Sequence, residues 1–98
     1  MIQQDFAYRV AELVKKDDAV IGLAAGGSWI TNEIDEYSDL DLILITKIKI
    51  AGDKEKMMDY ARHFGDLISG FTGEHVGEPR VLICLYDKPL LHVDIKFL

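Results

Sequence analysis

The apolar run from residue 39 to 45 begins with two aspartates, Asp39 and Asp41, that alternate with leucines. In a β-strand, successive side chains point to opposite faces, so both aspartates would share one face while Leu40 and Leu42 enter a core. Two like charges this close repel each other, and a fold keeps such a pair mainly when a cation lies between the carboxylates. Carboxylate oxygens are the ligands that Mg²⁺ prefers. The run therefore predicts a strand with one buried face and one cation-binding face.

Size and charge narrow the classes of protein that fit this chain. The 98 residues are enough for one modest core, so we expect a single domain over residues 1–98. The formal net charge of −6 disfavours binding to a long nucleic-acid backbone. No apolar run approaches the ~20 residues that cross a bilayer, and residues 1–5 lack the basic start of a signal peptide. We expect a cytoplasmic protein with no membrane partner.

The hydrophobic pattern predicts an α/β (α+β) domain with a short mixed sheet of about four strands and helices mainly on one face. We expect helices over residues 2–16, 29–34 and 54–69, and strands over residues 19–25, 39–46, 80–86 and 90–98. The last two strands would form an antiparallel hairpin, and the glycine-rich stretch 70–79 is interpreted as a loop. Cys84, the single cysteine, lies in an apolar run and is interpreted as a buried structural thiol.

The last predicted strand carries a third acidic residue. His92, Asp94 and Lys96 share one face of this strand, and apolar residues share the other. If the strand lies beside residues 39–46, Asp94 joins the aspartate pair. Three carboxylates can hold two Mg²⁺ ions about 3.5–4 Å apart, one activating an attacking hydroxyl and the other holding a triphosphate. The alternative for Asp94 is a solvent-facing residue paired with Lys96. His92 could assist Asp94, and the alternative for His92 is a plain exposed histidine.

A glycine turn precedes the aspartate pair. Gly26 and Gly27 would let backbone N–H groups approach a phosphate closely, because glycine has no side chain. Ser28 would add a hydroxyl at a helix N-terminus, which favours anions. The alternative is a plain turn. A phosphate-binding turn combined with metal-binding carboxylates is typical of phosphoryl or nucleotidyl transfer.

These motifs together resemble the DNA polymerase beta-like nucleotidyltransferase superfamily. The resemblance lies in Gly27-Ser28, a spacer of ten residues, Asp39-Leu40-Asp41-Leu42, and the later Val93-Asp94-Ile95. The sequence of residues 35–42 is most similar to the corresponding segment of bacterial antibiotic-type and stand-alone nucleotidyltransferases. The resemblance covers nearly the whole chain, which would be the catalytic core of such an enzyme.

The resemblance implies a role for each motif residue. Gly27 and Ser28 would contact the β- and γ-phosphates, and Asp39 and Asp41 would bind both Mg²⁺ ions. Asp94 would bind the metal nearer the acceptor and help to deprotonate its hydroxyl. The implied reaction transfers a nucleoside monophosphate, with ATP as the expected donor, to a hydroxyl of an unidentified acceptor, and pyrophosphate leaves.

The chain also departs from the family pattern. Many members carry Arg-Gly shortly after the Gly-Ser, where this chain has residues 30–33, Ile-Thr-Asn-Glu. This departure, the short length and the acidic charge favour a second hypothesis, a non-catalytic nucleotidyltransferase-like binding, antitoxin or partner module. A metal-binding domain with phosphatase-like chemistry is a third. Because the chain stops at a strand, we expect either a minimal enzyme or a fragment without the family's C-terminal helical domain, and the last strand could pair across a homodimer.

Overall fold

A computed structural model describes residues 2–26, 40–74, 77–87 and 90–98 of the chain. Within these ranges the order of elements is α1 (Ile2–Val14), β1 (Val20–Gly26), β2 (Leu40–Thr46), α2 (Lys54–Phe64), β3 (Asp66–Gly73), β4 (Glu78–Asp87) and β5 (Leu91–Phe97). None of the helices in the described ranges is long and apolar enough to cross a membrane. The class is α+β, in agreement with the mixed class that the sequence predicts.

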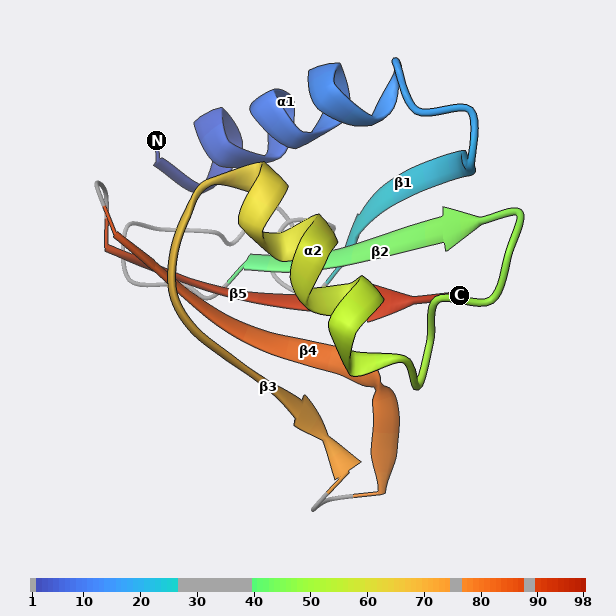
Figure 1. Cartoon of the computed structure of the whole chain (residues 1–98). Coiled ribbons are helices and arrows are strands. Elements are labelled where there is room, and N and C mark those ends of the chain that lie inside the picture. The colour runs from blue at the N-terminus through green and yellow to red at the C-terminus, as the bar shows by residue number, and fades with distance from the viewer. Residues whose placement is uncertain (1, 27–39, 75–76, 88–89) are drawn as a thin grey trace.

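The described strands form one mixed sheet in the order β1-β2-β5-β4-β3 (Figure 1). β5 lies beside β2 and runs parallel to it, although more than forty residues separate the two strands in the chain. The other three neighbouring pairs are antiparallel, including the predicted hairpin of β4 and β5. The candidate site described below is centred on the parallel pair of β2 and β5.

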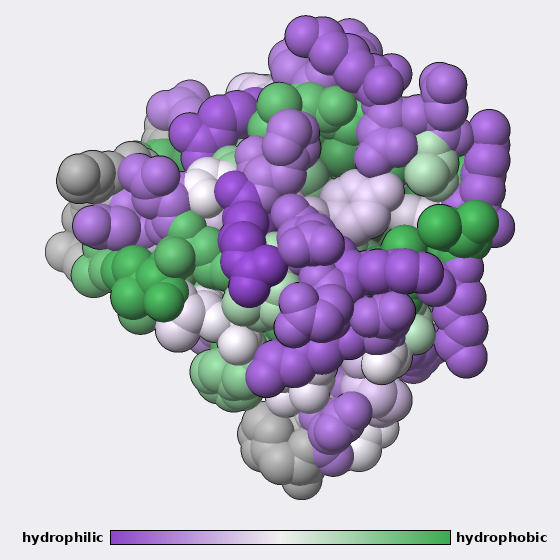
Figure 2. All heavy atoms as spheres, in the orientation of Figure 1, coloured by the Kyte–Doolittle hydropathy of each residue, from purple (hydrophilic) through white to green (hydrophobic). Residues whose placement is uncertain are grey.

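Both described helices pack on one face of the sheet, and Figure 1 shows α2 crossing in front of the strands. The surface on this side is mainly hydrophilic, because the outward faces of the helices are polar (Figure 2). Alternate residues of β2, β4 and β5 point toward the helices and build the core; they include Leu40, Leu42, Leu44, Leu82, Cys84, Tyr86, Val93, Ile95 and Phe97. The intervening residues of these strands are partly or fully exposed. The two faces of the sheet thus differ: one is buried under α1 and α2, and none of the described helices covers the other, which we call the open face.

The predicted helix over residues 54–69 is wrong at its C-terminal end. The sequence pattern extends it over residues 54–69 and makes residues 70–79 a loop, whereas α2 ends at Phe64 and β3 occupies Asp66–Gly73. The apolar residues Leu67 and Ile68 fit a helical stripe as well as a strand. Pairing of β3 with β4 decides for the strand, because tertiary context overrides local propensity. This correction raises the strand number from the predicted four to five in the described residues.

The remaining bounds differ from the predicted ones by one or two residues: α1 ends at Val14 rather than at residue 16, and β4 starts at Glu78 rather than at residue 80. The predicted short helix over residues 29–34 lies outside the described residues.

Two tyrosines connect α2 to the rest of the fold. Tyr86 is 1% exposed, donates a hydrogen bond to the Ala61 carbonyl at 2.7 Å, and packs its ring 4.7 Å from that of Phe6. Tyr60 donates to Asp17 Oδ2 at 2.9 Å and so ties α2 to the turn that follows α1. Burial and the Asp17 carboxylate raise the pKa of Tyr60 to about 12.

We expect the protein to lose stability at alkaline pH, partly through Cys84. The thiol is buried with no exposed area, and burial raises its pKa from 9.0 to about 12. The unfolded chain therefore releases this proton near pH 9, whereas the folded chain keeps it until about pH 12, so the contribution is complete below pH 9 and is lost as pH rises toward 12. Between pH 9 and pH 11, the free energy of unfolding measured with urea should fall further in the original protein than in Cys84→Ala, by on the order of 2 kcal/mol. Equal slopes in the two proteins would contradict the assignment.

The turn end of the β3–β4 hairpin leaves no room for a side chain at Gly73. A Cβ atom there would lie 2.6 Å from the Glu78 carbonyl oxygen, a backbone atom that cannot move without disturbing the pairing. We expect Gly73→Ala to lower the free energy of unfolding by about 1–3 kcal/mol, measured by urea denaturation. Gly22→Ala in β1 is the matched control, because its Cβ would make an ordinary contact of 3.6 Å with Ile45. Equal stability of the two variants would rule out the crowding.

Candidate functional site

Two of the three predicted carboxylates lie side by side on the open face of the sheet. In the parallel pair of β2 and β5, Asp41 is the register partner of Asp94. Register partners on neighbouring strands point to the same face of the sheet, and neighbouring strands are about 4.8 Å apart, so the two carboxylates lie close together. Their strand neighbours Leu40, Leu42, Val93 and Ile95 are buried, which fixes the face on which the carboxylates lie. A one-residue shift of either strand would bury a carboxylate, so the hydrophobic pattern itself holds this register.

The end of β1 completes this part of the sheet. Gly26 is the antiparallel partner of Asp41, and a Cβ placed on Gly26 would lie 3.9 Å from the Asp41 Cβ. The missing side chain leaves open space beside the carboxylate. A hollow of about 310 Å³ lies here, and its lining comprises Gly26, Asp41, Leu42, Ile43, Val81, Asp94 and Lys96. Both carboxylates therefore open into one hollow.

His92 contacts one of the carboxylates. Its Nε2 atom lies 3.1 Å from Asp94 Oδ1, and both atoms are shielded from solvent although the two side chains remain 40% and 34% exposed. A histidine in this place can hold the carboxylate in one orientation, and when protonated it can offset part of its charge. The sequence pattern places His92 on the same strand face as Asp94 and leaves two interpretations, a residue that assists Asp94 and a plain exposed histidine. The structure shows a contact with Asp94 for a side chain that stays partly exposed.

Lys96 brings positive charge to the same face. It lies in register with Ile43 of β2 and with Val81 of β4. Its ammonium group and, more strongly, hydrogen bonds from Arg80 lower the pKa of Glu78 to about 2. The hollow thus has a cationic side next to its acidic centre, an arrangement that suits a ligand with both a metal ion and phosphates.

The remaining predicted site residues, Gly27, Ser28 and Asp39, lie outside the described residues. In the sequence, Gly27 follows Gly26, which lines the hollow, and Asp39 directly precedes Leu40, the first residue of β2. Among the described residues no group of three or more His, Cys, Asp and Glu side chains gathers in a way that could hold a metal. The described part of the site is the pair of Asp41 and Asp94.

The chemistry of this pair fits Mg²⁺. Both side chains offer only carboxylate oxygens, which are hard donors, and Mg²⁺ is commonly held by one or two carboxylates while substrate phosphates complete its coordination. The other residues that line the hollow are Gly26, three aliphatic residues and Lys96, and none of them supplies a soft donor. Asp41 and Asp94 are therefore the described residues that would hold the ion.

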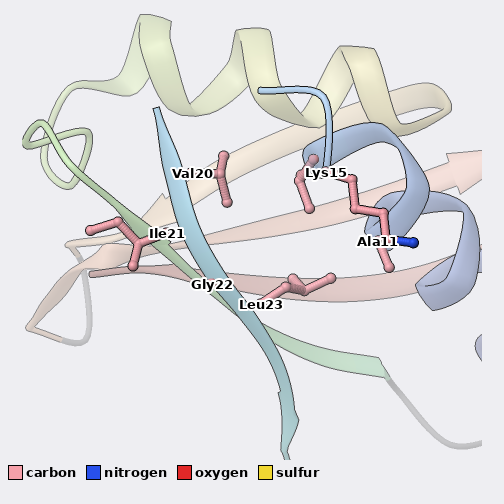
Figure 3. Close-up of a pocket in the computed structure, with 7 residues that line it drawn as sticks. Ala11, Lys15, Val20, Ile21, Gly22 and Leu23 are labelled. Atoms are coloured by element: carbon pink, nitrogen blue, oxygen red, sulfur yellow. The ribbon is translucent and has the colours of Figure 1, made fainter. Parts of the chain in front are cut away.

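A second hollow, between α1 and β1, offers little chemistry. It measures about 270 Å³, and Figure 3 shows Ala11 and Lys15 on one side of it and Val20 and Leu23 on the other. Lys15 is exposed and pairs with Glu12 at 3.3 Å. Apolar walls with one solvated ammonium group indicate a surface furrow between elements rather than a reactive site.

Comparison with known proteins adds nothing to this geometry: neither protein-family models nor curated proteins give a match to the chain.

Proposed function

We propose that this chain is the core of a magnesium-dependent nucleotidyltransferase, which transfers a nucleoside monophosphate from a nucleoside triphosphate, ATP being the expected donor, to a hydroxyl group. The observation that supports it most is the register of Asp41 and Asp94 on adjacent parallel strands, on the sheet face opposite the described helices. The motif resemblance supplies the reaction class, because such a pair of carboxylates by itself fits several kinds of metal chemistry.

In the proposed reaction the acceptor hydroxyl oxygen attacks the α-phosphorus of the nucleotide. The new P–O bond forms as the bond to the β-phosphate oxygen breaks, pyrophosphate leaves, and the hydroxyl proton passes to a carboxylate. We assign this proton to Asp94. The Asp94 carboxylate contacts His92 and lies on β5, which β2 separates from β1. Bound Mg²⁺ supplies the positive charge that neutralises the phosphates and makes the hydroxyl more acidic. Catalysis of this kind consists mainly of positioning and charge neutralisation.

Gly26 and Lys96 would act on the nucleotide rather than on the acceptor. Gly26 gives the nucleotide phosphates room beside Asp41, because any larger side chain would project into the hollow. Lys96 lies on the same face and can attract the triphosphate. The net charge of −6 would otherwise repel an anion, so a cation at the site is needed for binding.

A paramagnetic titration tests the proposal. Mn²⁺ takes the oxygen ligands that Mg²⁺ takes, and it broadens NMR signals of nearby nuclei. We expect low concentrations of Mn²⁺, with a non-hydrolysable ATP analogue present, to broaden the amide signals of Asp41 and Asp94 first. Asp94→Asn should weaken this effect, and Asp66→Asn at the exposed start of β3 should not. If Mn²⁺ left the amide signals of both Asp41 and Asp94 sharp, the metal site would be overturned and the non-catalytic partner module would be favoured.

A further inference from the structure

An apolar shelf continues the row of carboxylates across the open face of the sheet. Asp94 of β5 is in register with Ile83 of β4, and Ile83 is in register with Phe71 of β3. Together with Asp41, these residues form one row that runs across β2, β5, β4 and β3. The row changes from acidic to apolar between β5 and β4.

A neighbouring row crosses the same three strands β5, β4 and β3. His92 of β5 is in register with Leu85 of β4, and Leu85 with Ser69 of β3. The two rows enclose a hollow of about 280 Å³, whose lining comprises Ser69, Phe71, Ile83, Cys84, Leu85 and His92. These lining residues carry no formal charge unless His92 is protonated. We call Phe71, Ile83 and Leu85 the apolar shelf.

The shelf is accessible and joined to the carboxylates. Phe71 is 48% exposed, and Ile83 and Leu85 are partly exposed, because the described helices cover the opposite face. His92 belongs to both places: its side chain lines this hollow, and its Nε2 atom contacts Asp94. Neighbouring strands are about 4.8 Å apart, so Ile83 lies one strand spacing from Asp94, and Phe71 lies two spacings from Asp94. A small molecule of two fused rings spans such a distance.

The order of strands separates the two substrates. β1 with Gly26 lies on one side of the Asp41–Asp94 pair, and β4 and β3 with the shelf lie on the other. If the nucleotide phosphates occupy the space beside Gly26, the shelf faces the opposite side of the reacting centre. A molecule on the shelf would then present its hydroxyl to Asp94, the carboxylate assigned to the proton.

We propose that the shelf is the acceptor subsite and that the acceptor is an uncharged small molecule with an aromatic or apolar body and a hydroxyl at one end. This inference rests on the proposed function. An anionic acceptor would be repelled by the carboxylates. A sugar-like acceptor would place hydroxyl groups against the side chains of Phe71, Ile83 and Leu85, which offer no polar partners. An apolar ring gains most here, because it removes Phe71, Ile83 and Leu85 from water together.

Amide NMR of the full chain tests the subsite with 2-naphthylmethanol as the probe. We expect shifts that concentrate at Ser69, Phe71, Ile83, Leu85 and His92 and that saturate at millimolar probe. Ile83→Thr should weaken probe binding by about tenfold, because the exchange replaces an apolar contact with a hydroxyl while keeping the branched strand residue. Ile48→Thr, the same exchange at a 55% exposed residue outside the hollow, should leave binding unchanged.

Each outcome decides the proposal. Probe shifts at the shelf, sensitive to Ile83→Thr and accompanied by Mn²⁺ broadening at Asp41 and Asp94, support it. Mn²⁺ broadening without probe shifts at the shelf, or with equally strong binding of 2-naphthoate or glucose, overturns the acceptor class and leaves the proposed function standing. Absence of Mn²⁺ broadening at both aspartates overturns the proposed function and, with it, the acceptor role of the shelf. Circular dichroism of each variant shows whether the sheet is intact.

Discussion

Asp41→Asn is expected to lower magnesium-dependent release of pyrophosphate from ATP by about a thousandfold or more, the scale on which single charged contacts act in phosphoryl transfer. The asparagine keeps the shape of the side chain but offers one neutral oxygen in place of a carboxylate. The measurement is pyrophosphate release in the presence of Mg²⁺ and a panel of uncharged aromatic alcohols. Full activity of Asp41→Asn would exclude a metal role for this residue.

The fold should survive this change. Asp41 lies on the open face, and its exchange relieves repulsion from Asp94, so we expect the free energy of unfolding to stay within about 0.5 kcal/mol of the original value. Asp59→Asn on the exposed face of α2 is the matched control for charge, because Asp59 pairs with Arg62 far from the carboxylates. A control that loses activity equally would show that net charge, not the site, is being measured.

Phe97→Ala is expected to produce the largest loss of stability, about 3–5 kcal/mol in the free energy of unfolding. Phe97 has no exposed area, is the register partner of Leu44 in the parallel pair, and packs 6.2 Å from the Tyr60 ring. Its removal would leave a cavity where β5 meets both β2 and α2. Because small domains are stable by only about 5–15 kcal/mol, such a loss is a large part of the total. Urea denaturation followed by circular dichroism measures it.

The neighbouring residue provides the control. Leu98 is 49% exposed, and its backbone, rather than its side chain, pairs with β2 through Leu44 and Thr46. Leu98→Ala removes a similar apolar group and should cost less than about 1 kcal/mol. If both variants lost equal stability, the contribution of Phe97 would come from the strand end as a whole and not from burial of its ring.

Much of the strand pattern was readable in the sequence. Alternation of apolar and polar residues located β2 and β5, and it also predicted which face carries Asp41 and Asp94. This worked because a half-buried strand has a side-chain period of two, which few other structures share. β3 was missed for the converse reason: Leu67 and Ile68 are compatible with a helix and a strand, and the choice depends on a partner strand that starts at Glu78.

The site divides in the same way. The sequence by itself identified Asp41 and Asp94 as candidate site residues, because carboxylates that alternate with apolar residues can be recognised without a structure. Only the tertiary structure decided that Asp94 stands beside Asp41, that His92 contacts Asp94, and that Ile83 and Phe71 continue the row. The physical reason is that strand order and register arise from contacts between distant parts of the chain. Local propensity cannot encode them, and burial of the other face of the same strands fixes them.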